Sequence, residues 1–289
     1  MNLPDFVGWS LALVPVIVLT AAFIWLDVFK LVGLWQALGL LAVGGLAAFA
    51  AYPLSGVFLD TLPIGFTIYS RLVAPWIEEA LKSIVIISLF RFNFIGLKID
   101  AVIMGLAVGA GFSVVENILY LLRFPELSPA VWLVRGAGTA IMHGTTMAIL
   151  AAVAQQLAER ESRRAAGDFR FNPLWFVPGL LAAVAIHTLF NQFGGRPMVS
   201  LLGTLTLAPL SLMAIFRFGS VEAREWLTIE QDAHQRLLDT LHAGQFPDAP
   251  GWQRIASLAQ GSDAHTQAEI REYVTLLTEL ILTSEENLL

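Results

Sequence analysis

The residues best suited to chemistry in this sequence begin with two adjacent carboxylates, Glu78 and Glu79, followed by Lys82. In a helix, Glu78 and Lys82 are i, i+4 neighbours and Glu79 and Lys82 are i, i+3 neighbours, so the ammonium group can pair with either carboxylate on one face. Two carboxylates beside one cation rarely titrate alike, because their surroundings differ. This pattern is typical of general acid–base catalysis, although a Glu–Lys pair can also simply lock two helices together.

Two further groups have spacings that suit a hydrolytic site. Phe112 and Glu116 share a helical face, with Asn117 beside the carboxylate. His187 and Asn191 are i, i+4 neighbours, so an imidazole and an amide project together and could donate hydrogen bonds to an oxyanion. Each group could instead have only a structural role, since a histidine in a membrane is often a packing residue and Asn191 could cap its helix.

The elements that carry these residues are apolar enough to span a membrane. Of the 289 residues, 56% are hydrophobic and 14% are charged, whereas a soluble domain carries about 25% charged residues. A span needs about 20 apolar residues. The sequence therefore predicts an all-α, polytopic membrane bundle of about seven transmembrane helices, over Phe6–Leu26, Val32–Ala51, Leu72–Phe90, Ile99–Leu122, Gly136–Leu157, Leu174–Phe193 and Met198–Phe216.

The chain divides by charge into a membrane part, residues 1–218, and a small helical tail, residues 219–289. The membrane part has 11 acidic and 13 basic residues, and the tail has 12 acidic and 4 basic residues. Amphipathic patterning predicts tail helices over Trp226–Leu241 and Ala268–Leu282, which could recognise a cytoplasmic partner; a loosely ordered acidic tail is the alternative. The net charge of −6 argues against nucleic acid as a partner, and the absence of cysteine excludes disulfides and thiolate chemistry.

The loops predict an orientation. With the tail in the cytoplasm, nine basic residues near the spans lie inside and four lie outside, which follows the positive-inside rule and puts the N-terminus outside. We expect an integral protein of a bacterial plasma membrane, in contact with the lipid bilayer. The stretch from Tyr52 to Arg71 contains proline and glycine and looks too broken for a span, so we expect an interfacial or re-entrant segment there.

Ionisable residues inside the predicted spans are few, and they converge at one depth. An ionised group at the bilayer centre costs at least about 2.5 to 3.5 kcal/mol, so these groups need partners or a watery cavity. At 1.5 Å per residue, four of them lie roughly 10 to 14 Å below the arginines expected at the outer surface. Glu78, Glu116, His143 and His187 are seven, seven, eight and nine residues from Arg71, Arg123, Arg135 and Arg196 respectively. A shared, functional site in the outer leaflet follows.

These residues also carry a family resemblance. Glu78-Glu79-Ala80-Leu81-Lys82 matches an EExxK motif, Phe112 to Asn117 matches FxxxEN, and His187 to Asn191 matches HxxxN. The set resembles the PrsW family of intramembrane proteases, which is related to the CAAX-processing and Abi glutamate proteases. In CAAX proteases the basic residue stands one place later and the second motif has His where this chain has Glu116, which favours the PrsW branch. The resemblance covers about residues 71–191.

The resemblance implies hydrolysis of a peptide bond in a membrane-anchored protein, such as an anti-sigma-factor-like single-span substrate. It implies that Glu78 is the general base, Glu79 its partner and Lys82 the cation that positions both. His187 and Asn191 would stabilise the oxyanion. Glu116 occupies the second motif, with Phe112 and Asn117 in supporting places, and His143, in Met142-His143-Gly144-Thr145-Thr146, belongs to a further family-like element.

Two questions stay open at this level. His143, His187 and one of Glu78, Glu79 or Glu116 could bind zinc, but the chain has no HExxH motif and Lys82 would disfavour a nearby dication, so we expect no cofactor and keep zinc as the alternative. A proton-coupled transporter or a catalytically silent scaffold could use the same cluster. No inverted repeat is evident, and a scaffold needs neither a base nor donors.

Overall fold

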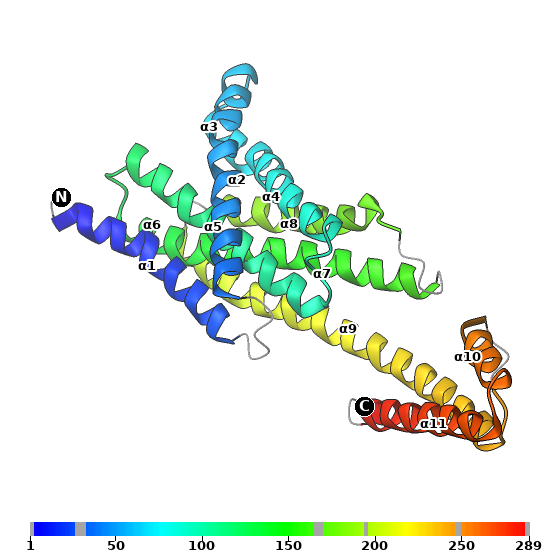
Figure 1. The fold of residues 1–289 in the computed structure, drawn as a ribbon. Coiled ribbons are helices and arrows are strands. Elements are labelled where there is room, and N and C mark those ends of the chain that lie inside the picture. The colour runs from blue at the N-terminus through cyan, green and yellow to red at the C-terminus, as the bar shows by residue number, and fades with distance from the viewer. Residues whose placement is uncertain (1–2, 27–32, 165–169, 194–195, 247–249, 287–289) are drawn as a thin grey trace. The chain divides into compact units, whose positions relative to one another are not determined.

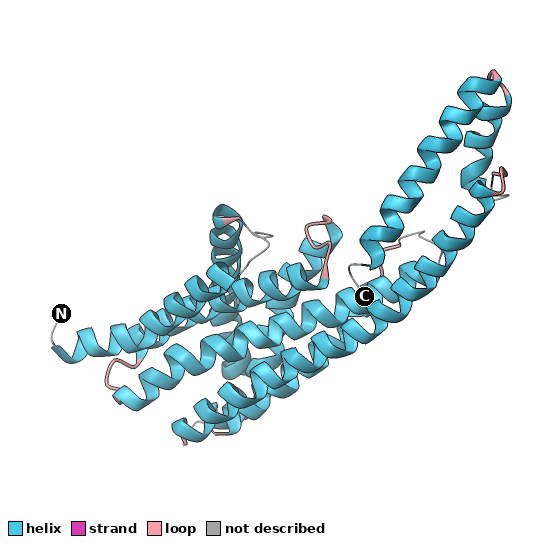
Figure 2. Ribbon diagram, turned by 90° about the horizontal axis from the view of Figure 1, so that it is seen from below, coloured by secondary structure: helices cyan, strands magenta, loops and turns pink. Residues whose placement is uncertain are grey.

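The computed structural model describes residues 3–26, 33–164, 170–193, 196–246 and 250–286, and these residues form helices and no strand (Figure 2). The predicted all-α class is confirmed. The chain divides into two compact units, Met1–Ile215 and Phe216–Leu289. Every motif residue lies in the first unit, so that unit contains the candidate site.

In the first unit, α5 (Lys98–Arg123) and α7 (Ala140–Arg164) form the most extensive helix–helix contact, and other helices pack against this pair (Figure 1). α7 also packs against α8 (Phe176–Gln192), and α5 also packs against α2 (Leu34–Thr61) and α1 (Leu3–Leu26). α4 (Ala74–Arg91) contacts α2, α8 and α7. The four helices that carry the motifs, α4, α5, α7 and α8, therefore lie beside one another.

Small residues allow the central helices to approach closely. A side chain at Gly109 of α5 would overlap the backbone of α7 at His143 and Gly144, and a side chain at Gly105 would overlap it one turn further along, at Met147 and Ala148. Because glycine has no Cβ atom, the two backbones can touch at these positions. The contact at Gly109 sets the distance between α5 and His143.

Two short π-helical segments precede motif-bearing helices. η1 (Tyr69–Val73) follows the single turn α3 (Phe66–Ile68) and leads into α4, and η2 (Val134–Thr139) follows α6 (Pro129–Leu133) and leads into α7. A π-helical turn inserts a residue into the helix and rotates the side chains that follow, and such turns occur often at functional sites. Here each rotates a helix that carries a motif residue.

Four helical segments in the described part of the chain are long and apolar enough to cross a membrane: Leu34–Thr61, Lys98–Arg123, Pro129–Ser162 and Pro173–Gln192. The last begins with the 3₁₀ turn η3 (Pro173–Trp175). α4 is not among them, because Glu78, Glu79, Lys82 and Arg91 make it too rich in charge. The apolar parts of α1 and α9, Phe6–Ala21 and Met198–Ser211, are shorter.

The structure corrects two expected boundaries. The residues from Tyr52 to Thr61, expected to be broken, continue α2 through Pro53. Proline removes only one backbone hydrogen bond, and a helix can continue past it. The expected tail helix Trp226–Leu241 is part of α9 (Pro197–His242), which begins in the last apolar run. The rest of the second unit is α10 (Pro250–Gln260) and α11 (Ala264–Glu286).

Candidate active site

Glu79 is the centre of a buried hydrogen-bond network. Its Oε1 atom accepts a hydrogen bond from Lys82 Nζ at 2.6 Å and another from His187 Nδ1 at 2.7 Å. The side chains of Glu79 and Lys82 are fully buried. The Lys82 ammonium also lies 4.6 Å from the centre of the Phe112 ring, a cation–π contact. Glu79 is thus held by a cation of its own helix and an imidazole of α8.

The two histidines are held in opposite tautomers by their partners. His143 Nδ1 lies 2.7 Å from Lys82 Nζ, and because the ammonium can only donate, this nitrogen accepts. His143 Nε2 then carries the hydrogen and donates to Glu116 Oε2 at 3.2 Å. In His187 the hydrogen is on Nδ1, which donates to Glu79, so Nε2 has a free lone pair.

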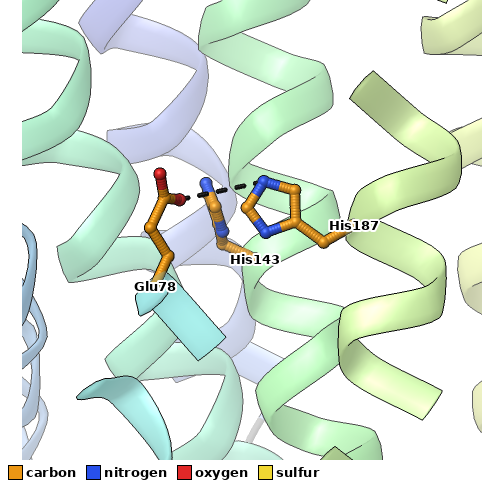
Figure 3. Close-up of side chains that lie close together, drawn as sticks. All are labelled: Glu78, His143 and His187. Atoms are coloured by element: carbon orange, nitrogen blue, oxygen red, sulfur yellow. Dashed lines mark ion pairs between the residues drawn. The ribbon is translucent and has the colours of Figure 1, made fainter. Parts of the chain in front are cut away.

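Glu78 differs from its neighbour because its carboxylate makes no hydrogen bond to a described residue, whereas Glu79 accepts two on Oε1. The Oε2 atom of Glu78 is buried and, like Oε2 of Glu79, has no hydrogen-bond partner among the described residues. The closest interaction of this oxygen is with His187 Nε2, at 3.8 Å, as the dashed line in Figure 3 shows. Glu78, His143 and His187 come from α4, α7 and α8 and point toward one another. A separation of 3.8 Å is too long for a direct hydrogen bond but suits a bridging water molecule.

An arginine that the sequence did not identify as part of the site completes the cluster. Arg135 Nη2 lies 3.0 Å from Glu116 Oε1, and the guanidinium carbon lies 3.4 Å from the centre of the Tyr120 ring. From the sequence alone, Arg135 is expected at the outer surface, as a marker of depth only. Its side chain is 14% exposed, because an arginine stem is long enough to reach inward from the end of a span. The signal available in the sequence was an acidic residue, Glu116, with no cation three or four residues away on its own helix.

The structure brings most of the predicted residues together. Glu78, Glu79, Lys82, Phe112, Glu116, His143 and His187 form one connected cluster. Their catalytic roles stay predictions.

The two asparagines lie at the margin of this cluster and hold backbones. Asn117 donates to the carbonyl oxygens of Ala12 and Arg135, both at 3.0 Å, which ties α5 to α1 and η2. Asn191 donates to the carbonyl oxygen of Ser70 in η1 at 2.8 Å. The role of Asn191 in oxyanion binding stays a prediction. The observed bond shows that Asn191 contacts the segment that leads into α4 and helps to position it.

The residues present fit a zinc ion. Glu78, His143 and His187 each offer a ligand atom, and the three atoms lie within 4.8 Å of one another. Two imidazoles and a carboxylate are a common donor set for catalytic zinc. Glu78 Oε2 has no hydrogen-bond partner in the described part of the chain, and the bond from His187 Nδ1 to Glu79, which leaves the Nε2 lone pair available, is the second-sphere contact that metal-bound histidines usually have. His143 would have to exchange one of its two hydrogen bonds, to Lys82 or to Glu116, for the metal.

Comparison with known proteins agrees with this geometry. A family model described as PrsW family intramembrane metalloprotease matches residues 32–217, which is more than half of the chain and includes all of the motif residues. No curated protein and no solved structure matches the chain.

Proposed function

Because the chain belongs to the PrsW family of intramembrane proteases, we propose that it is an endopeptidase that hydrolyses a peptide bond of a membrane-anchored protein with water activated by Glu78. A single-span, anti-sigma-factor-like protein is the proposed class of substrate. The family makes the protein a membrane protease; the catalytic residues and the substrate are our proposal.

The observation that carries the proposal is the contrast between the two adjacent carboxylates. Glu79 has a cation and an imidazole on one oxygen, and these hold it as an anion in a fixed position. Glu78 makes no hydrogen bond to a described residue, and its buried Oε2 lies 3.8 Å from His187 Nε2. Oε2 of Glu79 is also buried without a partner among these residues, but it belongs to a carboxylate that two hydrogen bonds already fix. An acceptor with no partner costs about 1–3 kcal/mol when it is buried, and a water molecule bound there would recover that cost. Glu78 is therefore suited to act as the base.

In the proposed reaction, a water molecule lies between Glu78 Oε2 and His187 Nε2. Glu78 takes a proton from this water while the water oxygen attacks the carbonyl carbon of the substrate. The protonated Glu78 carboxyl then gives the proton to the leaving amine. Lys82 holds Glu79, Glu79 orients His187 through Nδ1, and His143 connects Lys82 to Glu116. Asn191 fixes the backbone that leads into α4.

The metal-dependent form of the reaction would use the same residues differently. Glu78, His143 and His187 would hold zinc, which makes its bound water more acidic and polarises a carbonyl group. We propose the metal-independent form, because both nitrogens of His143 already have partners and one partner is the Lys82 ammonium, which repels a dication. The expected absence of a cofactor is part of this proposal.

Cleavage of a co-reconstituted single-span protein tests the proposal. Glu78→Gln should lower kcat by about 10²–10⁴, the usual contribution of a general base, while the variant still inserts and keeps its melting temperature. Glu126→Gln, which changes an exposed carboxylate between α5 and α6, is the matched control and should retain wild-type activity. Full activity in Glu78→Gln would refute the role of Glu78. Loss of wild-type activity on treatment with a strong chelator, restored by zinc, would refute the metal-independent form.

We further propose seven transmembrane helices with the N-terminus outside, a catalytic bundle over residues 1–218, and a soluble cytoplasmic tail over residues 219–289. The chain has no cysteine, so a single introduced cysteine is a unique label. In intact cells, a membrane-impermeant thiol reagent should label Ser128→Cys, at the start of α6, and should not label His265→Cys, at the start of α11. The opposite pattern would reverse the orientation. Labelling of both or of neither would refute the odd number of spans, three, that the proposal places between these two positions.

A further inference from the structure

The site contains unsatisfied donors as well as the unsatisfied acceptor atoms of Glu78 and Glu79. Arg135 Nε and Nη2 are buried, and neither makes a hydrogen bond to any described residue. The 3.0 Å contact between Nη2 and Glu116 Oε1 is an ion pair whose geometry falls outside that of a hydrogen bond. Each buried donor without an acceptor costs about 1–3 kcal/mol. A guanidinium needed only to neutralise Glu116 would be expected to use both nitrogens on the carboxylate.

Contacts on two sides fix the position of the guanidinium. One face stacks on Tyr120, and one edge lies beside Glu116, whose other oxygen accepts a hydrogen bond from His143. His143 is bonded in turn to Lys82 of α4, the helix that carries Glu78. Arg135 is thus connected through Glu116, His143 and Lys82 to the helix that carries Glu78. Arg135 and Glu78 are also close enough to interact electrostatically.

Each donor nitrogen expected from the motifs already has at least one partner. The single N–H of His187 donates to Glu79, and one N–H of the Asn191 amide donates to the Ser70 carbonyl oxygen. Lys82 Nζ has Glu79 and His143 as partners and lies over the Phe112 ring. Of the cations in the cluster, Arg135 alone has buried nitrogens with no hydrogen-bond partner among the described residues.

We propose that Arg135 is a catalytic residue that donates hydrogen bonds to the oxygen of the scissile carbonyl and stabilises the oxyanion. This inference rests on the proposed function. As the water oxygen bonds to the carbonyl carbon, its proton passes to Glu78 and the π electrons of the carbonyl move to the oxygen beside Arg135. When the tetrahedral intermediate collapses, those electrons restore the carbonyl group, the C–N bond breaks, and the proton held by Glu78 leaves with the amine.

The experiment compares two forms of one synthetic single-span peptide, with an amide or a thioamide at the scissile bond after that bond has been mapped by mass spectrometry. Sulfur accepts hydrogen bonds more weakly than oxygen, so the thioamide should be cleaved more slowly wherever a donor stabilises the oxyanion. Arg135→Gln should lower kcat for the amide by about 10²–10³ with little change in KM, the effect of losing one oxyanion donor. The ratio of amide to thioamide rates should fall at least about tenfold from its wild-type value.

The controls separate this role from a structural one. Arg123→Gln changes an arginine at the end of α5 that donates to the Tyr52 hydroxyl, and it should leave kcat and the rate ratio unchanged. If Arg135→Gln does not fold, Arg135→Lys, which keeps the charge beside Glu116, should show the same direction of change. A kcat within about threefold of wild type would overturn the proposal. So would a lower kcat with an unchanged rate ratio, which is the result expected if Arg135 acts only by neutralising Glu116.

The outcomes also distinguish this proposal from the proposed function. If the wild-type protein cleaves and Glu78→Gln does not, the function stands, and only the Arg135 results decide the inference. If the wild-type protein cleaves no member of a broad peptide panel, the proposed function fails and the inference falls with it.

Discussion

Replacing Lys82 with Met should weaken the helix bundle less than the full burial of the ammonium group suggests. Removing one partner of a buried ion pair in a soluble protein costs about 3–5 kcal/mol. The Glu79–Lys82 pair, however, lies within α4 at i, i+3 spacing, so it persists when inserted helices separate in the membrane. Between helices, the substitution removes the hydrogen bond from Lys82 to His143 of α7.

The magnitude follows from that one bond. A hydrogen bond to a charged group contributes about 1.5–3 kcal/mol in soluble proteins. Bonds between helices in membrane bundles average about 0.6 kcal/mol and reach about 1.7 kcal/mol, because separated helices find other partners. Since the Lys82–His143 bond is 2.7 Å long and fully buried, we expect a value near the upper end, about 1–2 kcal/mol. Lys82→Met should lower the free energy of unfolding by this amount.

Two double-mutant cycles measure the effect by reversible unfolding in mixed micelles, followed by circular dichroism. The cycle of Lys82→Met with His143→Leu should give a coupling of about 1–1.5 kcal/mol, and the cycle with Glu79→Gln should give less than about 0.5 kcal/mol. Lys98→Met is the control, because the partly exposed pair of Lys98 with Glu159, 3.9 Å apart, should contribute at most about 1 kcal/mol. A larger coupling to Glu79 than to His143, or a loss above about 3 kcal/mol in Lys82→Met alone, would refute the reasoning.

Two further predictions concern packing and a helix cap. Gly109→Ala should lower the free energy of unfolding by about 1–3 kcal/mol and reduce proteolysis, because the added methyl group would meet the backbone at His143. Gly39→Ala, at a position with open space around it, should leave melting temperature and activity unchanged. In the second unit, the backbone N–H and hydroxyl groups of Thr266 hold the pKa of Asp263 below its usual value. Asp263 should therefore stabilise the start of α11 fully above about pH 5, and this stabilisation should be lost as the pH falls below about 4. Hydrogen exchange at α11 should differ between wild type and Asp263→Asn above about pH 5, and the two should converge in acid.

The sequence predicts the parts of this fold that depend on apolar periodicity and length. In the described part of the chain, each of the seven apolar runs is almost entirely helical, and the depth count from the arginines brings Glu78, Glu116, His143 and His187 together, because helix rise is nearly constant. Hydropathy can locate α4 as a helix but cannot show how its charges pair. The partners of Glu79 come from its own helix and from α8, 108 residues away.

Other features depend on tertiary contacts and could not be predicted. Arg135 stands near the end of an apolar run, where a sequence pattern favours the aqueous surface, and only the position of Glu116 on a neighbouring helix draws it inward. Asn191 has the spacing of an oxyanion donor, yet its bond is to a backbone oxygen 121 residues away. Pro53 suggests a break, but the helix continues through it, because proline removes only one backbone hydrogen bond.

The pairing of charges in the site has a consequence for the direction of proton transfer. Glu79 has Lys82 and Glu116 has Arg135, so with both histidines neutral these four groups balance electrically. Glu78 is then the excess negative charge of the cluster, in a setting of low polarisability where a net charge is costly. Each proton taken from water makes the cluster neutral, and each proton returned to a leaving amine restores the charge. In the proposed reaction, the surroundings themselves therefore favour the uptake of that proton.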